Sequence, residues 1–413
     1  MTGDPLQFSR PVAAAMALGD AALDRHRFIQ KRVLLTGDTD ILLTSNGHEI
    51  FRAAFLLLIR ICRDVSIALP GPCAELKADI EALAQHTVAD YMPAFLDDKT
   101  DNAHFDAVLS VGCGKNPGAT RTTINSDGWL ARVSSGATPL PKGRNRTNAI
   151  GAFGAACLGV AEVFKRLIAL RDTRGQLLNG MSFSLWTYKE ESTDIGPDLD
   201  LFSIDVLLVG CGAIGSGTAY LLSRLPISGR AIAIDRQDYR RENFGTSITV
   251  GEKDYERPKA QVVAELLRTR LTTDFRMADI AQYQVEYDGH HPDVVLAGLD
   301  DIDPRHAVQQ IWPALVIDGA VGGELSCQVS CHPWPSDIAC LLCVFQKPPM
   351  ASLDELTARA TGLPAGLTND PDALVTEDVI AAGPAERRSW LRSHLGKRIC
   401  SITSEAVTKF LGQ

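Results

Sequence analysis

A chain of 413 residues, 45% hydrophobic and 22% charged, is long enough to form two globular domains with sizeable cores. Its net charge of −9 argues against nucleic acid as the main partner, because proteins that bind a phosphate backbone usually present a basic face. The first residues lack the basic start and apolar stretch of a signal peptide, and the most apolar segment, residues 51–70, is interrupted by four charged side chains. These features favour a cytoplasmic protein and exclude the membrane as a partner.

The first half of the chain alternates expected strands and helices in the order of a parallel α/β unit. Strands are expected at residues 31–38, 64–70 and 105–112, and helices at residues 47–62 and 74–86. One or two strands in 122–136, a turn-rich loop over 137–148 and an Ala-rich buried helix over 149–170 complete this unit. We assign residues 1–170 to a first domain and the polar residues 171–200, with a strand near 182–188, to a connector.

A second alternation begins at residue 205. It runs from a strand at 206–209 through a glycine turn and a helix to a strand at 231–235, and then to a helix at 257–271. Further strands are expected within residues 291–301, 314–321 and 323–332. The predicted fold class is therefore α/β with two Rossmann-like units, of which only the second, in a domain of residues 201–413, carries good nucleotide signals.

A G-x-G-x-x-G motif lies between the first strand and first helix of this second unit, where bare backbone can approach a phosphate at the helix N-terminus. The next expected strand ends at Asp235, whose carboxylate could accept hydrogen bonds from ribose hydroxyls. A dinucleotide oxidoreductase would show the same pair, so these signals alone do not choose between NAD(P) and ATP. The turn residues that we predict to bind the nucleotide are Gly210, Gly212, Ala213, Ile214 and Gly215.

The residues after Asp235 favour a triphosphate. Asn243 lies in a polar loop, and Lys259 lies just inside a helix begun by Pro258, where a cation can neutralise phosphate charge. Asp300 lies just past the end of a strand, the edge at which open α/β sheets bind ligands, and could hold Mg²⁺. An oxidoreductase would leave Lys259 and Asp300 without a role.

Residues 201–345 resemble the ThiF/MoeB and ubiquitin-activating enzyme superfamily through the glycine turn, the block from Asp235 to Asn243, the lysine, the block from Asp300 to Arg305 and a C-x-x-C. The resemblance implies ATP and Mg²⁺ as cofactors. It places the ribose at Asp235 and the magnesium ion at Asp300. Thr246 stands where the family usually has an arginine, so that another arginine must supply this charge. The cofactor-binding residues implied beyond the turn are Asp235, Asp238, Asn243, Lys259, Asp300 and Arg305.

The first half has a glycine-containing turn at residues 108–118 but no matching acidic residue and lysine. It resembles the inactive copy in the inactive-plus-active adenylation pair of ubiquitin-activating enzymes and of bacterial Bil defence systems. This resemblance implies a pseudo-dimer within one chain, with a homodimer as the alternative, and a part in antiviral defence. It also implies that Arg25 or Arg27 reaches the ATP γ-phosphate, whereas a solvated basic helix face is the alternative for either residue.

Ten cysteines without a secretion signal are better interpreted as thiols, metal ligands or a nucleophile than as disulfides. Cys340 and Cys343 match the family's first zinc half-site, but the usual second C-x-x-C is missing. Cys327 and Cys331 could complete an unusual four-cysteine site. Packing in an apolar core is an equally good interpretation of "CLLC".

Cys400 follows Lys397 and Arg398 and precedes an expected helix, an environment that lowers a thiol pKa and favours a nucleophile. In ubiquitin-activating relatives the thioester cysteine lies beyond the C-x-x-C, close to a crossover segment. Residues 344–400 would form that segment, with a mobile polar loop after Cys343. A buried structural cysteine is the alternative.

These observations predict an enzyme that adenylates the C-terminal glycine of a ubiquitin-like protein and then takes it onto Cys400 as a thioester. A conjugating enzyme would be a further partner. Two alternatives stay open. One is an adenylating enzyme whose reaction ends in sulfur transfer to a carrier, and the other is a nucleotide-binding scaffold that has lost catalysis. The predicted catalytic residues are Cys400, Lys259, Arg25 and Arg27.

Overall fold

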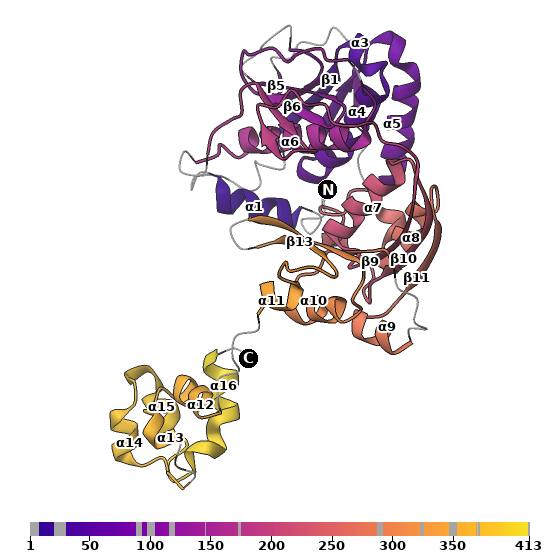
Figure 1. Cartoon of the computed structure of the whole chain (residues 1–413). Coiled ribbons are helices and arrows are strands. Elements are labelled where there is room, and N and C mark those ends of the chain that lie inside the picture. The colour runs from indigo at the N-terminus through magenta and orange to yellow at the C-terminus, as the bar shows by residue number, and fades with distance from the viewer. Residues whose placement is uncertain are drawn as a thin grey trace. The chain divides into compact units, whose positions relative to one another are not determined.

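The computed structural model describes residues 8–19, 30–87, 93–96, 104–114, 120–144, 146–171, 175–286, 292–322, 326–346, 353–368, 370 and 372–411. The chain divides into two compact units, Met1–Phe345 and Gln346–Gln413 (Figure 1). Within the described ranges, no helix is long and apolar enough to cross a membrane.

The first sheet belongs to the N-terminal half of the unit Met1–Phe345, and its described strands follow the order β3-β2-β1-β4-β5-β6-β7-β8. The strands from β3 to β5 are parallel, whereas β6, β7 and β8 are added antiparallel. Part of the expected connector, residues 171–200, thus extends this sheet. The strands are β1 (Arg32–Gly37), β2 (Asp64–Ala68), β3 (Ala94–Leu96), β4 (Ala107–Val111), β5 (Arg121–Asp127), β6 (Leu130–Ser134), β7 (Met181–Ser184) and β8 (Lys189–Glu190).

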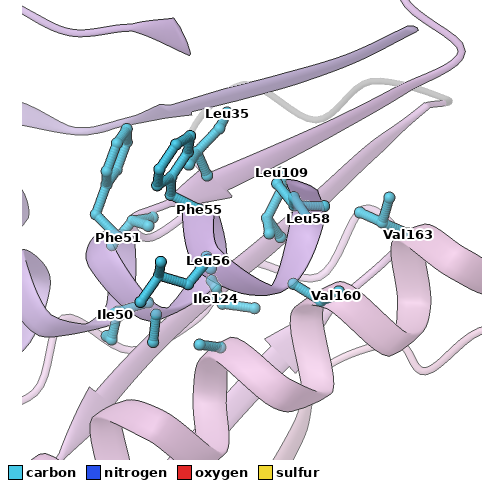
Figure 2. Packing of buried hydrophobic residues seen from close by; sticks show 14 of the residues in the cluster. Leu35, Ile50, Phe51, Phe55, Leu56, Leu58, Leu109, Ile124, Val160 and Val163 are labelled. Carbon is cyan, nitrogen blue, oxygen red and sulfur yellow. The ribbon is translucent and has the colours of Figure 1, made fainter. Parts of the chain in front are cut away.

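Helices α4, α5 and α6 bury the main core of this half against one face of the sheet. The Thr44 side chain caps α4 by accepting a hydrogen bond from the Gly47 amide, and Asn148 caps α6 in the same way. Figure 2 shows α4 and α6 side by side over Leu35 and Leu109. Because α4 is apolar on most of its surface, it lies buried between neighbours. The described helices are α1 (Ser9–Leu18), α3 (Thr39–Leu42), α4 (Ser45–Ile61), η1 (Gly71–Cys73), α5 (Ala74–Thr87) and α6 (Ala149–Leu167).

The second sheet has the order β11-β10-β9-β12-β13-β14, with only β14 antiparallel. Side chains alternate along β9, so that Val206 and Leu208 face α7 and α8 while Leu207 and Val209 face α9, α10 and α11. The strands are β9 (Phe202–Val209), β10 (Ile227–Ile234), β11 (Thr272–Arg276), β12 (Val294–Ala297), β13 (Leu315–Val321) and β14 (Cys327–Pro333). The helices are α7 (Ala213–Arg224), η4 (Arg241–Asn243), η5 (Glu252–Asp254), α8 (Lys259–Leu267), α9 (Ile280–Glu286), α10 (Ile302–Gln309) and α11 (Leu341–Val344).

Both sheets repeat one topology. In chain order, the first five strands of each lie 3-2-1-4-5 and are parallel, and the sixth is antiparallel. This is the doubly wound order, in which ligands bind beyond the carboxyl ends of the strands where the order reverses. The crevices so defined lie between β1 and β4 and between β9 and β12. The predicted α/β class with two Rossmann-like units is confirmed.

The two halves of this unit are joined by buried polar contacts. Glu49 of α4 accepts hydrogen bonds from the Tyr220 hydroxyl at 2.7 Å and from the Arg224 guanidinium at 2.8 Å, both on α7. Burial, together with the Glu49 carboxylate, raises the pKa of Tyr220 well above its ordinary value, so Tyr220 stays a donor. Arg60, also on α4, donates to the backbone carbonyls of Phe244 and Ile248.

The unit Gln346–Gln413 is a small helical bundle with its own apolar core, which includes Leu363, Ile380 and Leu391. The expected mobile loop after Cys343 is wrong for residues 353–368, which form two helices. The prolines, glycines and polar residues of this stretch predicted a loop, but its threonines are buried, and the Thr357 hydroxyl meets that of Thr403 at 3.0 Å. The described helices are α12 (Leu353–Thr361), α13 (Ala365–Thr368), α14 (Glu377–Ala382), η7 (Ala385–Arg387), α15 (Arg388–Arg392), η8 (Ile399–Ile402) and α16 (Thr403–Leu411).

The change Tyr220→Phe tests the contact between the halves. It should lower the free energy of unfolding by about 1.5–3 kcal/mol, the usual contribution of a buried hydrogen bond to a charged group. Urea unfolding of the full chain measures the loss. Tyr188→Phe, at a tyrosine that is 77% exposed, is the matched control and should leave the midpoint unchanged. Equal midpoints for the two variants would contradict a stabilising role of the Tyr220–Glu49 bond.

Candidate functional site

The glycine turn between β9 and α7 brings backbone into contact with backbone. A Cβ atom placed on Gly210, whose φ is +86°, would lie 2.6 Å from the Gly298 carbonyl oxygen, and one on Gly215 would lie 1.9 Å from the Gly210 oxygen. A Cβ on Gly212 would meet nothing within 4 Å. Gly210 and Gly215 are therefore needed for packing, whereas Gly212 borders open space. Ala213 and Ile214 begin α7, and Ile214 packs toward Gly298.

Asp235 lies at the end of β10 and holds this turn in place. Its carboxylate oxygens accept hydrogen bonds from the Cys211 and Gln237 amides, both at 2.8 Å. The buried Tyr239 hydroxyl donates to the Cys211 carbonyl at 2.9 Å and ties the next loop to the turn. Burial raises the pKa of the Cys211 thiol well above its ordinary value, and the nearby Asp235 charge adds a smaller increase. Cys211 is thus an inert thiol at pH 7.

Lys259 is the first residue of α8 and is only 6% exposed. Its ammonium group donates to the Gln237 side-chain oxygen at 2.7 Å and lies 5.9 Å from the centre of the Tyr239 ring. Among the described residues no carboxylate forms an ion pair with it. A buried cation balanced only by a neutral amide is unfavourable by itself, so this position suits an incoming anion.

The loop from Asp238 to Lys259 is folded by its own contacts. Asn243, which is buried, accepts a hydrogen bond from the Arg240 amide through its side-chain oxygen and so caps η4. Asp238 forms an isolated backbone bridge with Pro258. Thr246, at the position where a family arginine was expected, donates to the Asn243 carbonyl. The Asn243 oxygen is therefore committed to the loop.

Asp300 lies beyond β12 and is exposed, without a side-chain hydrogen bond or ion pair to the described residues. It is three residues past Ala297, and the amide of the intervening Gly298 bonds to the Val209 carbonyl, so Asp300 shares an edge with the glycine turn. Mg²⁺ takes one or two carboxylates and completes its shell with phosphate oxygens and water. The free carboxylate of Asp300 at this edge fits that ion.

Arg305 is buried below the Asp300 loop. Its guanidinium pairs with Asp318 of β13 at 3.2 Å and also donates to the carbonyls of Leu299 and Asp301. Burial raises the pKa of Asp318 even though the Arg305 charge opposes this shift. Arg305 was expected at the nucleotide, but these contacts make it the residue that holds the loop carrying Asp300.

The C-x-x-C lies at α11, where the Cys340 and Cys343 sulfur atoms are 3.7 Å apart. Burial tends to raise the pKa of Cys340, but hydrogen bonding with the Cys343 backbone and side chain outweighs that effect and lowers the pKa. Cys327 and Cys331 are exposed on β14. No group of three or more potential metal ligands occurs in the described ranges, so the four-cysteine zinc site is not formed there.

Cys400 lies in η8 of the other unit and is exposed, which contradicts the alternative of a buried structural cysteine. Arg398, expected to act on this thiol, pairs with Asp372 at 3.2 Å. Arg25 and Arg27 fall outside the described residues.

The corresponding edge of the first sheet carries a carboxylate. Asp38, just past β1, accepts a hydrogen bond from the Cys113 amide at 3.0 Å, and a Cβ on Gly112 would lie 2.3 Å from its oxygen. Within its described residues, this half therefore has the Rossmann-like fold with a carboxylate at the edge where the second half has an open glycine turn.

Sequence reasoning missed Gln237, Tyr239 and Asp318. Tyr239 lies between Asp238 and Glu242 of the predicted block, but its bond to the glycine turn joins residues 28 positions apart. An aromatic residue in an otherwise polar loop was the one available signal.

A model described as the ThiF family matches residues 188–394, half of the chain. The uncharacterised protein y4jF of Sinorhizobium fredii is 31% identical over 266 residues, which cover 60% of this chain and 49% of that protein. The bacterial E1-like protein BilD of a Collimonas species is 26% identical over 230 residues, covering 52% of this chain and 49% of BilD. The chain spans about half the length of these curated relatives.

Among solved structures, Escherichia coli MccB with ATP is similar at a TM-score of 0.25 and 20% identity, over 28% of this chain and 37% of that one. A score of this size supports no inference about function.

The two glycines that differ in their surroundings give a direct test of the turn. Gly215→Ala should destabilise the protein by about 1–3 kcal/mol, because its Cβ would overlap the Gly210 carbonyl oxygen. Gly212→Ala should change stability by less than about 0.5 kcal/mol, because its Cβ enters open space. Urea unfolding measures both. A destabilised Gly212→Ala protein would show that protein atoms, and no ligand space, border this glycine.

Proposed function

Because the chain belongs to the ThiF family, an adenylyltransferase superfamily, we propose that it uses ATP and Mg²⁺ to adenylate the C-terminal glycine of a ubiquitin-like protein. We further propose that Cys400 then accepts the glycyl group as a thioester. The E1-like name of BilD supports a ubiquitin-like partner. A conjugating enzyme would then accept the ubiquitin-like protein from Cys400. A cytoplasmic location and a role in antiviral defence would be consistent with this pathway.

The buried ammonium group of Lys259 is the observation that carries the proposal. It lies beside a turn with open space at Gly212, at the carboxyl edge where the strand order reverses. A nicotinamide dinucleotide needs no buried lysine here, whereas the β- and γ-phosphates of ATP would replace the neutral Gln237 as its partner. Asp235 would accept the ribose hydroxyls and Asp300 would hold Mg²⁺, which would neutralise phosphate charge.

The first step forms a mixed anhydride. An oxygen of the glycine carboxylate attacks the α-phosphorus of ATP, the bond from that phosphorus to the bridging oxygen breaks, and pyrophosphate leaves. Lys259 contributes by holding the phosphates in line and by stabilising the charge that builds on the leaving group. Arg25 or Arg27 is proposed to contact the γ-phosphate. Either arginine would supply the positive charge that Thr246 lacks.

The second step moves the acyl group to sulfur. The Cys400 thiolate attacks the glycyl carbonyl carbon, a C–S bond forms, the C–O bond to the adenylate breaks, and AMP leaves. The thiol proton passes to solvent. Exposure of Cys400 at the surface of its unit supports this role, because a nucleophile must be accessible to its acyl donor.

Lys259→Met tests the nucleotide site. Calorimetry with ATP and MgCl₂ should detect binding to the wild-type chain and at least about tenfold weaker binding to the variant, the effect of one lost charge-assisted hydrogen bond. Lys253→Met removes the same charge from an exposed position in η5 and is the control. Binding of NAD⁺ in place of ATP would overturn the adenylation proposal.

Cys400→Ala separates the two steps. With ATP and a ubiquitin-like protein ending in glycine, the variant should keep ATP–pyrophosphate exchange but form no thiol-sensitive adduct on a non-reducing gel. Cys331→Ala, at another exposed cysteine, should behave as wild type. An adduct that persists in Cys400→Ala would assign the nucleophile to another cysteine. Exchange without any adduct in the wild-type chain would favour sulfur transfer.

A further inference from the structure

The pair Cys340 and Cys343 has a geometry that the adenylation chemistry does not use. The two sulfur atoms lie 3.7 Å apart, and the Cys343 amide donates to the Cys340 carbonyl at 2.9 Å, so both residues lie in one turn. Cys343 is exposed and Cys340 is half-buried. A small reagent can therefore reach the pair from solvent.

The surroundings of this pair do not complete a metal site. Zinc in a structural site takes four ligands, and no third ligand joins the two thiols within the described ranges, which contain all ten cysteines. Cys327 and Cys331 are four residues apart on an extended strand, and hence roughly 13 Å apart along it. That separation exceeds the reach of a disulfide, so these two thiols cannot bridge to each other.

We propose that Cys340 and Cys343 form a reversible disulfide, made by exchange with a small disulfide of the oxidised-glutathione class, and that its closure acts on the nucleotide site. In the exchange one thiolate attacks the small disulfide and releases one small thiol. The second thiolate attacks the resulting mixed disulfide and releases the other. The pair is oxidised by two electrons, the small disulfide is reduced to two thiols, and an S–S bond of about 2.05 Å replaces the 3.7 Å contact.

The Cys340 side of the pair is anchored to β14 and α10. The carbonyl of Ala339, next to Cys340, meets the ring of the buried His332 at 2.6 Å. The Leu341 amide donates to the side chain of Gln309 at 3.1 Å, and the Leu341 side chain is fully buried. The Cys340 side is thus held at Ala339 and Leu341, and we expect the Cys343 side of α11 to adjust when the bond closes.

The Cys343 side is linked to the Asp300 loop. Two residues beyond Cys343, the Phe345 carbonyl meets the His306 ring at 2.6 Å, and the Phe345 ring lies 4.5 Å from the Arg305 guanidinium. Arg305 in turn holds the carbonyls on both sides of Asp300. A shift of this end of α11 would therefore reach the Asp300 loop through Arg305. This second part of the inference rests on the proposed function, whereas disulfide formation does not.

The disulfide is tested on the full chain with mixtures of reduced and oxidised glutathione, followed by alkylation. A protease that cuts after acidic residues yields one peptide of residues 338–354, with Cys340 and Cys343, and another of residues 325–337, with Cys327 and Cys331. We expect the first peptide to lose both alkyl groups under oxidising mixtures and to regain them with dithiothreitol, while the second keeps both. In Cys343→Ser, Cys340 should show no intramolecular bond.

Two results would overturn the disulfide. Full alkylation of residues 338–354 at every glutathione ratio would mean that the thiols do not bridge. One zinc ion per purified chain, measured by mass spectrometry and lost in Cys343→Ser, would mean that the pair ligates metal.

The coupling is tested by calorimetry with ATP and MgCl₂ on the oxidised and reduced chains. We expect at least threefold weaker binding to the oxidised wild-type chain, and equal binding to the two preparations of Cys343→Ser. Equal binding to oxidised and reduced wild type would overturn the coupling while the disulfide stands. Absence of binding in both states would instead refute the proposed function, since the alkylation experiment does not depend on ATP.

Discussion

The site of the second sheet depends on how closely its backbone segments approach one another. Gly215 lies next to the Gly210 carbonyl, and Gly210 lies next to the Gly298 carbonyl. A Cβ atom on Gly215 or Gly210 would overlap the neighbouring carbonyl oxygen. This contact brings the turn after β9 and the loop after β12 to one edge. Without it, the helix that begins at Ala213 and the loop that carries Asp300 would stand apart, and no single ligand could contact both.

The fold class was predictable because it follows from the hydrophobic periodicity of the segments and from the order of strands and helices along the chain. Buried strands with intervening helices give parallel sheets, and the glycines after β9 and the carboxylate after β12 meet because parallel strands end at one edge. The contacts that refine this edge were not predictable. Tyr239 to Cys211 and Arg305 to Asp318 are single hydrogen-bonded pairs whose partners lie on different elements, and composition does not specify them. The helices within residues 353–368 were missed because prolines and glycines indicate a loop, whereas the contact of Thr357 with Thr403 joins residues far apart in the chain.

The two halves of the unit Met1–Phe345 share one topology but differ in the groups at the carboxyl edges of their sheets. The second half presents a buried cation and open backbone, whereas the first presents the Asp38 carboxylate at the matching edge. The first half is nonetheless held to α7 through Glu49, at a carboxylate with two donors. Its place in the protein thus rests on packing and charge pairing with the second half.

This arrangement constrains how the two halves can diverge in sequence. Changes at Glu49 leave the Tyr220 hydroxyl and the Arg224 guanidinium without their acceptor, so they demand compensating changes on α7. In diverging lineages α4 and α7 should therefore change together.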